Sequence, residues 1–324
     1  MRASLAFFTA FVATILTTAV AAEDAYPSRA VRVLAAFGAG GTTDAYARII
    51  SKELQGELGQ SFVVENVTGA SGLVAATRVA KASADAYMLL FTTNAFVISP
   101  ALRRKMPFDP VKDFTPLAMV VYSPNMLVVK GDSRYKAVSD YLAAAKASPS
   151  GLSYASAGFE TSTHLVAEQF GQLTGTHNVQ VPYNATSAMA QALLAGDVDS
   201  IWLSGQAIAS FLETGQLRAL AVADDRRSRF APDAPTFEEL GYKGFVSGTW
   251  NAFFGPANLP GDIANKLART MERVVMRSQV QEELLRVGAD RVRIVAGAEF
   301  ENLIPKEIEF YKTLVRDSKI EPID

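Results

Sequence analysis

The sequence predicts an α/β protein built as two lobes around a ligand cleft. Three stretches, at residues 31–37, 62–65 and 88–91, read as strands, and each ends in a glycine-rich or polar loop before helical pattern resumes. Such repeated units are typical of parallel α/β construction. Without residues 1–22 the chain keeps about 300 residues. A single hydrophobic core rarely stabilises a chain of that length, which predicts two lobes. A cleft between lobes is a common place for a ligand.

The N-terminal segment has a signal-peptide profile. Met1 and Arg2 precede an apolar stretch at residues 5–20, and Ala21 and Ala22 follow it. The stretch is shorter than the roughly 20 residues that span a bilayer, and the small residues supply a cleavage site after Ala21 or Ala22. An uncleaved membrane anchor is the alternative. We predict that residues 1–22 are removed and that the mature chain is soluble.

The composition argues against several kinds of chemistry. The chain has no cysteine, which removes disulfides and thiolate catalysis, and it has only two histidines, His164 and His177. We therefore predict no metal site and no cofactor. Removing Arg2 from the 31 Lys+Arg leaves 30 cations against 33 Asp+Glu, a mature charge of about −3. No basic run indicates nucleic-acid binding.

The elements of the first lobe follow one another in a regular order. A strand at 31–37 meets the glycine break at 38–41, and a helix runs from Thr42 to Leu58 and stops at Gly59. The strand at 62–65 leads to the loop at 69–72 and a helix at 73–82, and the strand at 88–91 leads to 92–94. Residues 106–115 look irregular, and a short strand at 127–129 precedes the predicted crossing to the second lobe.

The second lobe repeats the alternation. We predict helices at 138–147, 164–173 and up to 194, with strands at 153–156, 179–181, 198–202 and 217–222. A charged stretch with several prolines at 224–235 predicts the connection by which the chain returns to the first lobe. Helices at 263–287 and 300–315 are expected to pack on that lobe. The predicted domains are the signal peptide at 1–22, a discontinuous first lobe at 23–128 and 226–324, and a second lobe at 129–225.

The loop at 37–44 could hold an anion. Its glycines let a ligand approach the backbone, and the N–H groups that begin the next helix carry partial positive charge. Thr42 and Thr43 add hydroxyl donors, although either could instead cap the helix in a purely structural turn. Asp44 suits the first helical turn, which indicates a structural role. A nucleotide-binding loop fits poorly. A P-loop needs a lysine after its glycines, and none follows here; the dinucleotide motif GxGxxG needs a glycine where Thr43 stands. Only Glu65, at the end of the next strand, matches the ribose-binding acid of that motif.

The loop at 157–163 repeats this design in the second lobe, with Thr161, Ser162 and Thr163 at a helix start. Two facing loops could grip the two ends of one small acid through amides, hydroxyls and waters, because neither contains Lys or Arg. Two ordinary helix caps are the alternative.

An exported serine hydrolase would need Ser156 or Ser162 with His164 and an acid such as Asp199, but the chain has no GxSxG motif. A hydrogen-bonded packing role is the expected one for His164. Asp197 and Asp199 could bind a metal or a cation, or simply form a turn before a strand. Core positions are predicted for Trp202, Trp250, Phe253 and Phe254, of which one could line the cleft.

Over essentially the whole mature chain, the sequence resembles the substrate-binding proteins of tripartite tricarboxylate transporters, also called Bug-type receptors. The residues that carry the resemblance are Tyr26-Pro27, the run 39–44 with Arg48, 64–66 with Gly69-Ala70, Asp113-Phe114, Pro182-Tyr183, 196–199, 220–222 and 232–236. The resemblance implies a type II periplasmic-binding-protein fold that closes on a carboxylated ligand in the periplasm and delivers it to the membrane components of such a transporter. We expect a monomer.

The resemblance also implies ligand-binding positions in the two loops. They are Phe37, Ala39, Gly40, Gly41, Thr42 and Thr43, opposed by Ala157, Gly158, Thr161 and Ser162, with Thr92, Asn94, Tyr183 and Ser204 as weaker candidates. No catalytic residue is expected.

The chain departs from the family pattern in three places. Asn184-Ala185 replaces Lys-Gly, Thr68-Gly69-Ala70-Ser71-Gly72 replaces Pro-Gly-Ala-Gly-Gly, and Asp85-Ala86-Tyr87-Met88 replaces Asp-Gly-Tyr-Thr. These changes bear on ligand identity and loop shape more than on the fold. A transport receptor is the leading hypothesis, with a ligand sensor for a signalling partner and an exported serine hydrolase as alternatives.

Overall fold

The computed structural model describes residues 26–158, 161–183 and 185–323. The predicted signal peptide, its cleavage site and Asn184 lie outside these ranges. No helix within them combines the length and the apolar character that crossing a bilayer requires.

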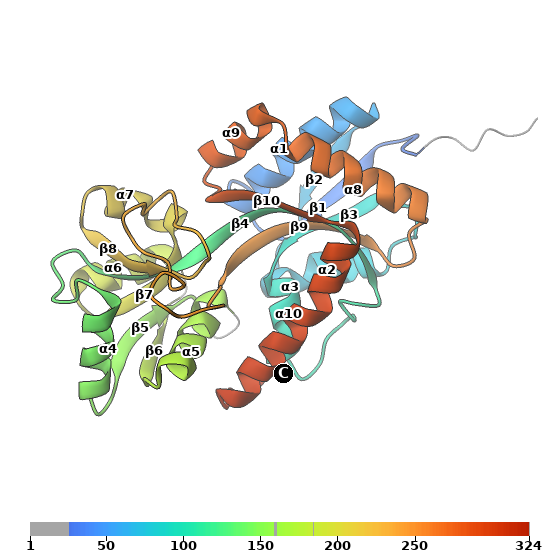
Figure 1. Cartoon of the computed structure of the whole chain (residues 1–324). Helices are drawn as coiled ribbons and strands as arrows, with labels where there is room; N and C mark the ends of the chain where they lie inside the picture. Colours follow the sequence, from blue (N-terminus) through green and yellow to red (C-terminus); the bar gives the residue numbers. More distant parts are fainter. Residues whose placement is uncertain (1–25, 159–160, 184, 324) are drawn as a thin grey trace, which may run out of the picture.

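Strands and helices alternate along most of the chain (Figure 1). The strands are β1 (Val31–Ala35), β2 (Phe62–Asn66), β3 (Met88–Thr93), β4 (Phe114–Lys130), β5 (Leu152–Ser156), β6 (Asn178–Pro182), β7 (Ser200–Ser204), β8 (Leu217–Val222), β9 (Gly248–Pro256) and β10 (Arg291–Ala296). The α-helices are α1 (Thr42–Leu58), α2 (Leu73–Ala80), α3 (Ala95–Leu102), α4 (Val138–Ala147), α5 (Ser162–Thr174), α6 (Thr186–Ala195), α7 (Ala209–Glu213), α8 (Gly261–Val275), α9 (Ser278–Arg286) and α10 (Gly297–Asp317), with short 3₁₀ turns at Ala70–Gly72 and Gly205–Ile208.

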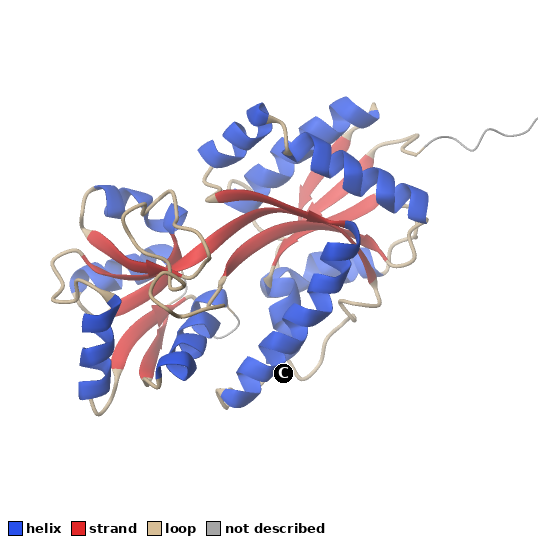
Figure 2. Ribbon diagram, in the orientation of Figure 1, coloured by secondary structure: helices blue, strands red, loops and turns tan. Residues whose placement is uncertain are grey.

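The strands form two sheets that share one long strand (Figure 2). In the first lobe the order is β2-β1-β3-β9-β4, with β10 also paired to β4; β1 is parallel to β2 and β3, and β9 is antiparallel to β3. In the second lobe β6, β5 and β7 are parallel, and β7 and β8 both pair antiparallel with β4. The predicted α/β construction in two lobes is confirmed.

The two lobes are joined by β4 and by the segment that leads into β9. The first part of β4, Phe114 to Pro124, pairs with β9, and the part from Asn125 onward pairs with β7. Asn125 and Ser247 stand at this change of sheet, and their side chains are joined by a hydrogen bond of 3.2 Å between Nδ2 and Oγ. Rotation of one lobe against the other would therefore bend the backbone at these positions.

Residues 226–247 pack with the second lobe, beyond its predicted end at 225. Phe237 and Phe245 lie in one buried cluster with Trp202 and Phe170, and their ring centroids are 5.8 and 6.1 Å from that of Trp202. The predicted domain bounds remain predictions. We propose that the chain returns from the second lobe to the first at about Ser247, and not at 225. Charge and proline marked a loop correctly, but composition does not say on which lobe a loop lies.

The first-lobe sheet is covered by helices on both faces. Alternate residues of β9 point to opposite faces of the sheet. Trp250 and Phe254 therefore pack in the core beside α2, α3 and α10, whereas Phe253 packs in the core beside α1 and α8. Trp202, Trp250, Phe253 and Phe254 are all buried, which confirms their predicted core positions.

The stretch predicted as one helix at 263–287 is two helices. Helix α8 ends at Val275 and α9 begins at Ser278, and Arg277 between them pairs with Glu53 of α1 at 3.1 Å. Both helices keep their apolar faces on the same core, so the periodic pattern continued through the break. Strands β9 and β10 were not predicted from the sequence, and only residues 127–129 of β4 were expected in a strand. Helix α3 follows the third predicted strand, where helical pattern was expected without stated bounds.

A buried apolar contact joins the lobes on the α10 side. Leu165 of α5 is 1% exposed, and it clusters with first-lobe residues of α3 and α10. Figure 1 shows the C-terminal end of α10 beside α5, where Gln172 Nε2 donates to Ser318 Oγ at 2.7 Å. The lobes thus touch away from the crossing strands as well.

Candidate functional site

The first-lobe loop is organised by one buried carboxylate. Asp44 is 5% exposed and accepts hydrogen bonds from the Gly40 amide (3.0 Å), from Arg48 Nε (3.1 Å) and from Asn66 Nδ2 (2.9 Å). Asn66 Nδ2 also donates to the carbonyl of Phe37 at 3.0 Å, which ties the end of β2 to the loop after β1. Burial opposes ionisation of Asp44, but these hydrogen bonds and the Arg48 charge lower its pKa to about 2. Its predicted structural role is confirmed.

The start of α1 carries no side-chain cap. Gly41 is the N-cap residue, with extended backbone at φ −79°, and no side chain accepts from the first helical N–H groups. The alternative in which Thr42 or Thr43 caps this helix is therefore wrong. Amides at a helix start have no partner within the helix, so those following Gly41 are free to face an anion. The amide of Gly40, in contrast, is used by Asp44.

Two neighbouring loops pack against this one. Gly69, Ala70, Ser71 and Gly72 all have positive φ, and a Cβ on Gly72 would lie 3.1 Å from Ala36 Cβ and 3.3 Å from Thr92 Oγ1. Thr92 is consequently buried under the Gly72 backbone. In the third loop Asn94 is also buried, and its Nδ2 donates to the Gly248 carbonyl at 2.8 Å.

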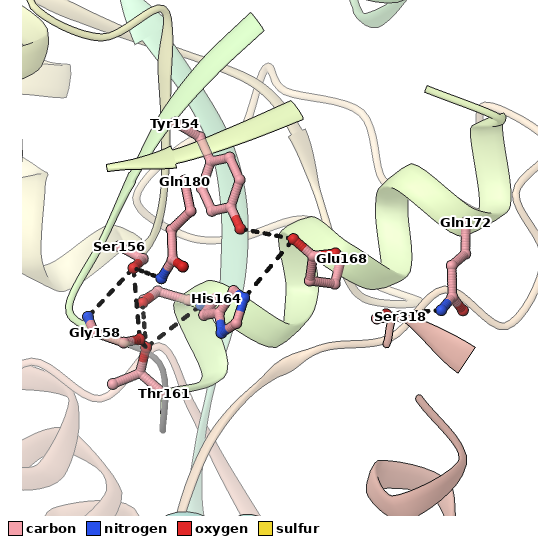
Figure 3. Close-up of polar contacts among 10 residues, drawn as sticks. Tyr154, Ser156, Gly158, Thr161, His164, Glu168, Gln172, Gln180 and Ser318 are labelled. Carbon is pink, nitrogen blue, oxygen red and sulfur yellow. Dashed lines mark hydrogen bonds and ion pairs between the residues drawn. The ribbon is translucent and has the colours of Figure 1, made fainter. Parts of the chain in front are cut away.

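The second-lobe loop is organised by hydroxyls (Figure 3). Thr161 is the N-cap of α5: its Oγ1 accepts from the amide of His164 at 3.4 Å and donates to the carbonyl of Gly158 at 2.7 Å. Ser156 Oγ accepts from the Gly158 amide and from Gln180 Nε2, at 3.2 and 2.6 Å. Ordinary capping thus accounts for Thr161, as the alternative interpretation allowed.

The remaining second-lobe candidates lie at strand ends. The amide of Tyr183 donates to the carbonyl of Ser156 at 2.9 Å, which places Tyr183 just beyond β6, beside the loop. Ser204 ends β7 and pairs with Asn125 on the crossing strand, so it lies at the junction of the lobes.

The polar groups around His164 favour packing over catalysis. His164 is buried, its Nε2 lies 3.7 Å from Glu168 Oε1, and Tyr154 donates to the same oxygen at 2.9 Å (Figure 3). Asp199 accepts from both the amide and the hydroxyl of Ser153, at 2.9 and 2.8 Å, which supports the turn interpretation of this acid. In the described ranges no group of three or more His, Cys, Asp or Glu residues could hold a metal ion.

Strand β9 connects the two loops, which sequence reasoning missed. Asn251 Nδ2 donates to Thr43 Oγ1 at 3.1 Å, and Thr249 Oγ1 lies 3.4 Å from Ser162 Oγ. Thr249 and Asn251 point to the same face of the strand because they are two positions apart. The alternation in Gly248-Thr249-Trp250-Asn251, with apolar or small residues between polar ones, is the signal that could have identified this strand.

Comparison with known proteins gives consistent matches along the chain. The family described as "Tripartite tricarboxylate transporter family receptor" matches residues 46–319. BugT of Bordetella pertussis is 30% identical over 320 residues, covering 98% of either chain. A solved R. palustris protein with adipate is 30% identical, with a TM-score of 0.77, covering 92% of this chain and 100% of the other. MatC of Rhodopseudomonas palustris, with bound malate, is also 30% identical, with a TM-score of 0.71 over 90% of this chain and 100% of the other.

Proposed function

The chain belongs to the tripartite tricarboxylate transporter receptor family, and on this premise we propose that it captures a small organic carboxylate between its lobes and delivers it to a membrane transporter of the tripartite tricarboxylate type. It is a solute-binding receptor and not an enzyme. We propose further that it works as a monomer in the periplasm, after cleavage of its signal peptide behind Ala21 or Ala22.

One observation carries the proposal of a carboxylate ligand. Two helix starts, one from each lobe, are attached to neighbouring positions of the same strand through Thr43–Asn251 and Ser162–Thr249. Each helix start presents backbone N–H groups and the positive end of a helix dipole, which favour an anion. The relatives solved with adipate and malate hold dicarboxylates, and such a molecule has a charged group for each lobe.

The ligand contacts that we propose are those of the two loops. Gly41, Thr42 and Thr43 would meet one carboxylate with amides and hydroxyls, and Ser162 with the amides after Thr161 would meet the other end. Phe37, Ala39 and Gly40 would shape the first-lobe wall, and Ala157 and Gly158 the second. Thr92, Asn94, Tyr183 and Ser204 are proposed as supporting positions. No lysine or arginine lies in either loop, so amides, hydroxyls and bridging waters would balance the ligand charge.

Closure would proceed by bending at the lobe junction. The segment around Asn125 and Ser247 joins the lobes, and the Ser162–Thr249 contact connects the second-lobe loop to strand β9 of the first lobe. A ligand that bridges both loops would bind the closed arrangement better than the open one and would shift the population toward it.

The first test is a screen for ligands by thermal shift and calorimetry. The mature protein, unfolded and refolded to release any co-purified ligand, would be titrated with adipate, malate, other mono- and dicarboxylates and the matching amides. A molecule that binds only the folded state raises the melting temperature. We expect shifts with one class of acids and none with their amides; no shift with any acid would contradict the proposal.

The same assay tests the first-lobe loop through Gly41→Val. The backbone of Gly41 has negative φ, and an added Cβ would meet only the Gly38 carbonyl at 3.5 Å, so the fold should be kept. The branched side chain would block close approach to the helix start, and we expect affinity for the acid to fall by about tenfold or more. Gly56→Val in the same helix, where an added Cβ meets nothing within 4 Å, is the control. Unchanged affinity in Gly41→Val would remove this loop from the site.

A further inference from the structure

A cavity lies where both lobes meet α10. It has a volume of about 270 Å³ and is lined by the crossing strands through Tyr122 and Trp250, by α10 through Glu307 and Tyr311, and by Gln169 of the second lobe. Trp250 points to the face of β9 opposite to Thr249 and Asn251, which contact the two loops. Asn94, proposed above as a supporting position for the carboxylate, also lines the cavity, but no described residue of the loops at 37–44 and 157–163 does.

The cavity contains a carboxylate that has no cationic partner. Glu307 Oε2 accepts from the indole Nε1 of Trp250 at 2.9 Å, and within the described part of the chain no cation lies within ion-pair distance of it. Burial raises the pKa of Glu307 to about 7, while the Trp250 hydrogen bond and the more distant Arg293 oppose that rise. A buried carboxylate that keeps its charge gains from an opposite charge beside it.

A second group in the wall also lacks a partner. The hydroxyl of Tyr122 is fully buried and has no hydrogen-bond partner in the described part of the chain. Buried polar groups are nearly always hydrogen-bonded, to protein, water or ligand. Its oxygen can accept a hydrogen bond from a donor inside the cavity.

Part of the wall is aromatic. Tyr122, Trp250, Phe310 and Tyr311 line the cavity together, and the rings of Phe310 and Tyr311 are 5.2 Å apart. Aromatic faces attract organic ammonium ions through the ring quadrupole. Arg293 also lines the cavity, but it is exposed, and its guanidinium lies 5.6 Å from the centre of the Tyr122 ring. Arg291 also lies over the Tyr122 ring, 5.3 Å from its centre, so that ring already has two cations and the other rings are left for a ligand. Neither guanidinium forms an ion pair with the Glu307 carboxylate within the described part of the chain.

We propose that this cavity binds a small organic ammonium ion, with the cation beside Glu307 and against the aromatic rings and with Tyr122 accepting an N–H where the ion has one. The size of the cavity restricts the ligand to a compact molecule. Tyr122, Trp250, Glu307 and Tyr311, which carry the site, lie outside the loops at 37–44 and 157–163, so we expect it to bind its ligand independently of the carboxylate.

The test uses the tryptophan in the cavity wall as a reporter. The chain has two tryptophans, and Trp202 is buried in the second-lobe core, so a Trp202→Phe protein reports only on Trp250. Its fluorescence would be titrated at pH 8 with methylammonium and tetramethylammonium chloride, with tert-butanol as an uncharged molecule of similar size, and with sodium chloride for ionic strength. We expect a saturable change with the ammonium ions alone. An equal response to tert-butanol, or none to either ion, would overturn the proposal.

Three variants test the contribution of the Glu307 charge separately from any effect on folding. Glu307→Gln keeps an oxygen that can accept from Trp250 but loses the charge, and we expect ammonium affinity to fall by about tenfold or more. Tyr122→Phe should weaken methylammonium about two- to fivefold and tetramethylammonium, which has no N–H, hardly at all. Glu309→Gln, an exposed change on the same helix, is the control. Wild-type affinity in Glu307→Gln would refute the site. Should that variant not fold, the Tyr122→Phe contrast between the two ions decides.

Carboxylate binding measured on the same variants keeps this proposal distinct from the proposed function. Glu307→Gln should bind the acid as the parent protein does, and Gly41→Val should bind ammonium as the parent does. Loss of both activities in Glu307→Gln would show a single shared site and would overturn the inference of a second one.

Discussion

The two loops that strand β9 connects share small and hydroxyl residues but are held in different ways. In the first lobe, the ionised side chain of Asp44 binds Gly40, Arg48 and Asn66, and the start of α1 is left without a cap. In the second lobe, the neutral side chains of Thr161 and Ser156 make the hydrogen bonds, and Thr161 caps α5 itself.

The difference indicates that the two loops have different roles in ligand binding. Charge-assisted hydrogen bonds are roughly twice as strong as neutral ones, so the first loop is the more rigid and keeps its helix amides available. The second loop uses hydroxyls that can rotate toward other partners. We expect the first loop to hold the carboxylate common to all ligands and the second to adapt to the rest of the molecule.

The largest effect that would test this comparison is expected from Asp44→Asn. The lowered pKa of Asp44 means that its ionised form is favoured in the folded state, so its contribution is complete above about pH 4 and is lost as the pH falls toward 2. Because folding lowers this pKa from 3.8 to about 2, the variant should lose about 2 kcal/mol of unfolding free energy at pH 7. It should also lose less stability than the parent between pH 4 and pH 2.

Denaturant unfolding as a function of pH measures both effects. Asp262→Asn is a suitable control, because Asp262 is also in the first turn of a helix but is exposed, so only the helix-dipole contribution changes. Equal losses in the two variants would mean that the Asp44 network adds nothing to an ordinary helix-dipole interaction.

A smaller effect is expected from Thr161→Val in the second-lobe loop. The change removes the N-cap of α5 and the hydrogen bond to Gly158 while keeping the shape of the side chain. Loss of an N-cap costs about 1 kcal/mol. Because the parent group is neutral, the loss should be the same at pH 3 and pH 7. Chemical denaturation at both pH values checks this, and a pH-dependent loss would contradict the proposed contrast between the loops.

The smallest effect is expected from Ser71→Gly in the loop that packs beside the first site. Ser71 has φ 55° and stands where the related proteins are expected to have glycine. Relief of left-handed backbone strain favours glycine by about 1–2 kcal/mol, and the greater freedom of glycine in the unfolded chain removes about 0.5–1 of this. We expect a gain of about 0.5–1 kcal/mol in unfolding free energy, measured by denaturation, whereas any loss would mean that the Ser71 side chain makes a stabilising contact.

Much of the fold could be predicted because its signals are local. The strand β1, the glycine break and the helix α1 follow one another within 30 residues, and the predicted helix end at Gly59 matches a left-handed C-cap with φ 73°. Strand β10 was missed although Arg291-Val292-Arg293-Ile294-Val295 alternates. The local signal for this strand was therefore present in the sequence and was overlooked.

The site was only half predictable. Hydroxyls and glycines at helix starts indicated both loops of the proposed site, since a helix start offers unpaired backbone N–H groups that suit an anion. Thr249 and Asn251 could not be found in this way, because their partners Ser162 and Thr43 lie 87 and 208 positions away along the chain. The cavity beside Glu307 is likewise assembled from strands, a helix and a loop that no local pattern connects.

By itself, the sequence determined the class of fold, the order of most elements and the chemistry of the two loops, because hydrophobic period, glycine and helix-start residues act over a few neighbouring positions. The tertiary structure decided which strand joins the lobes, where residues 226–247 pack and which side chains share a cavity. Those outcomes depend on contacts between distant segments, whose free energy arises only when both segments are in place.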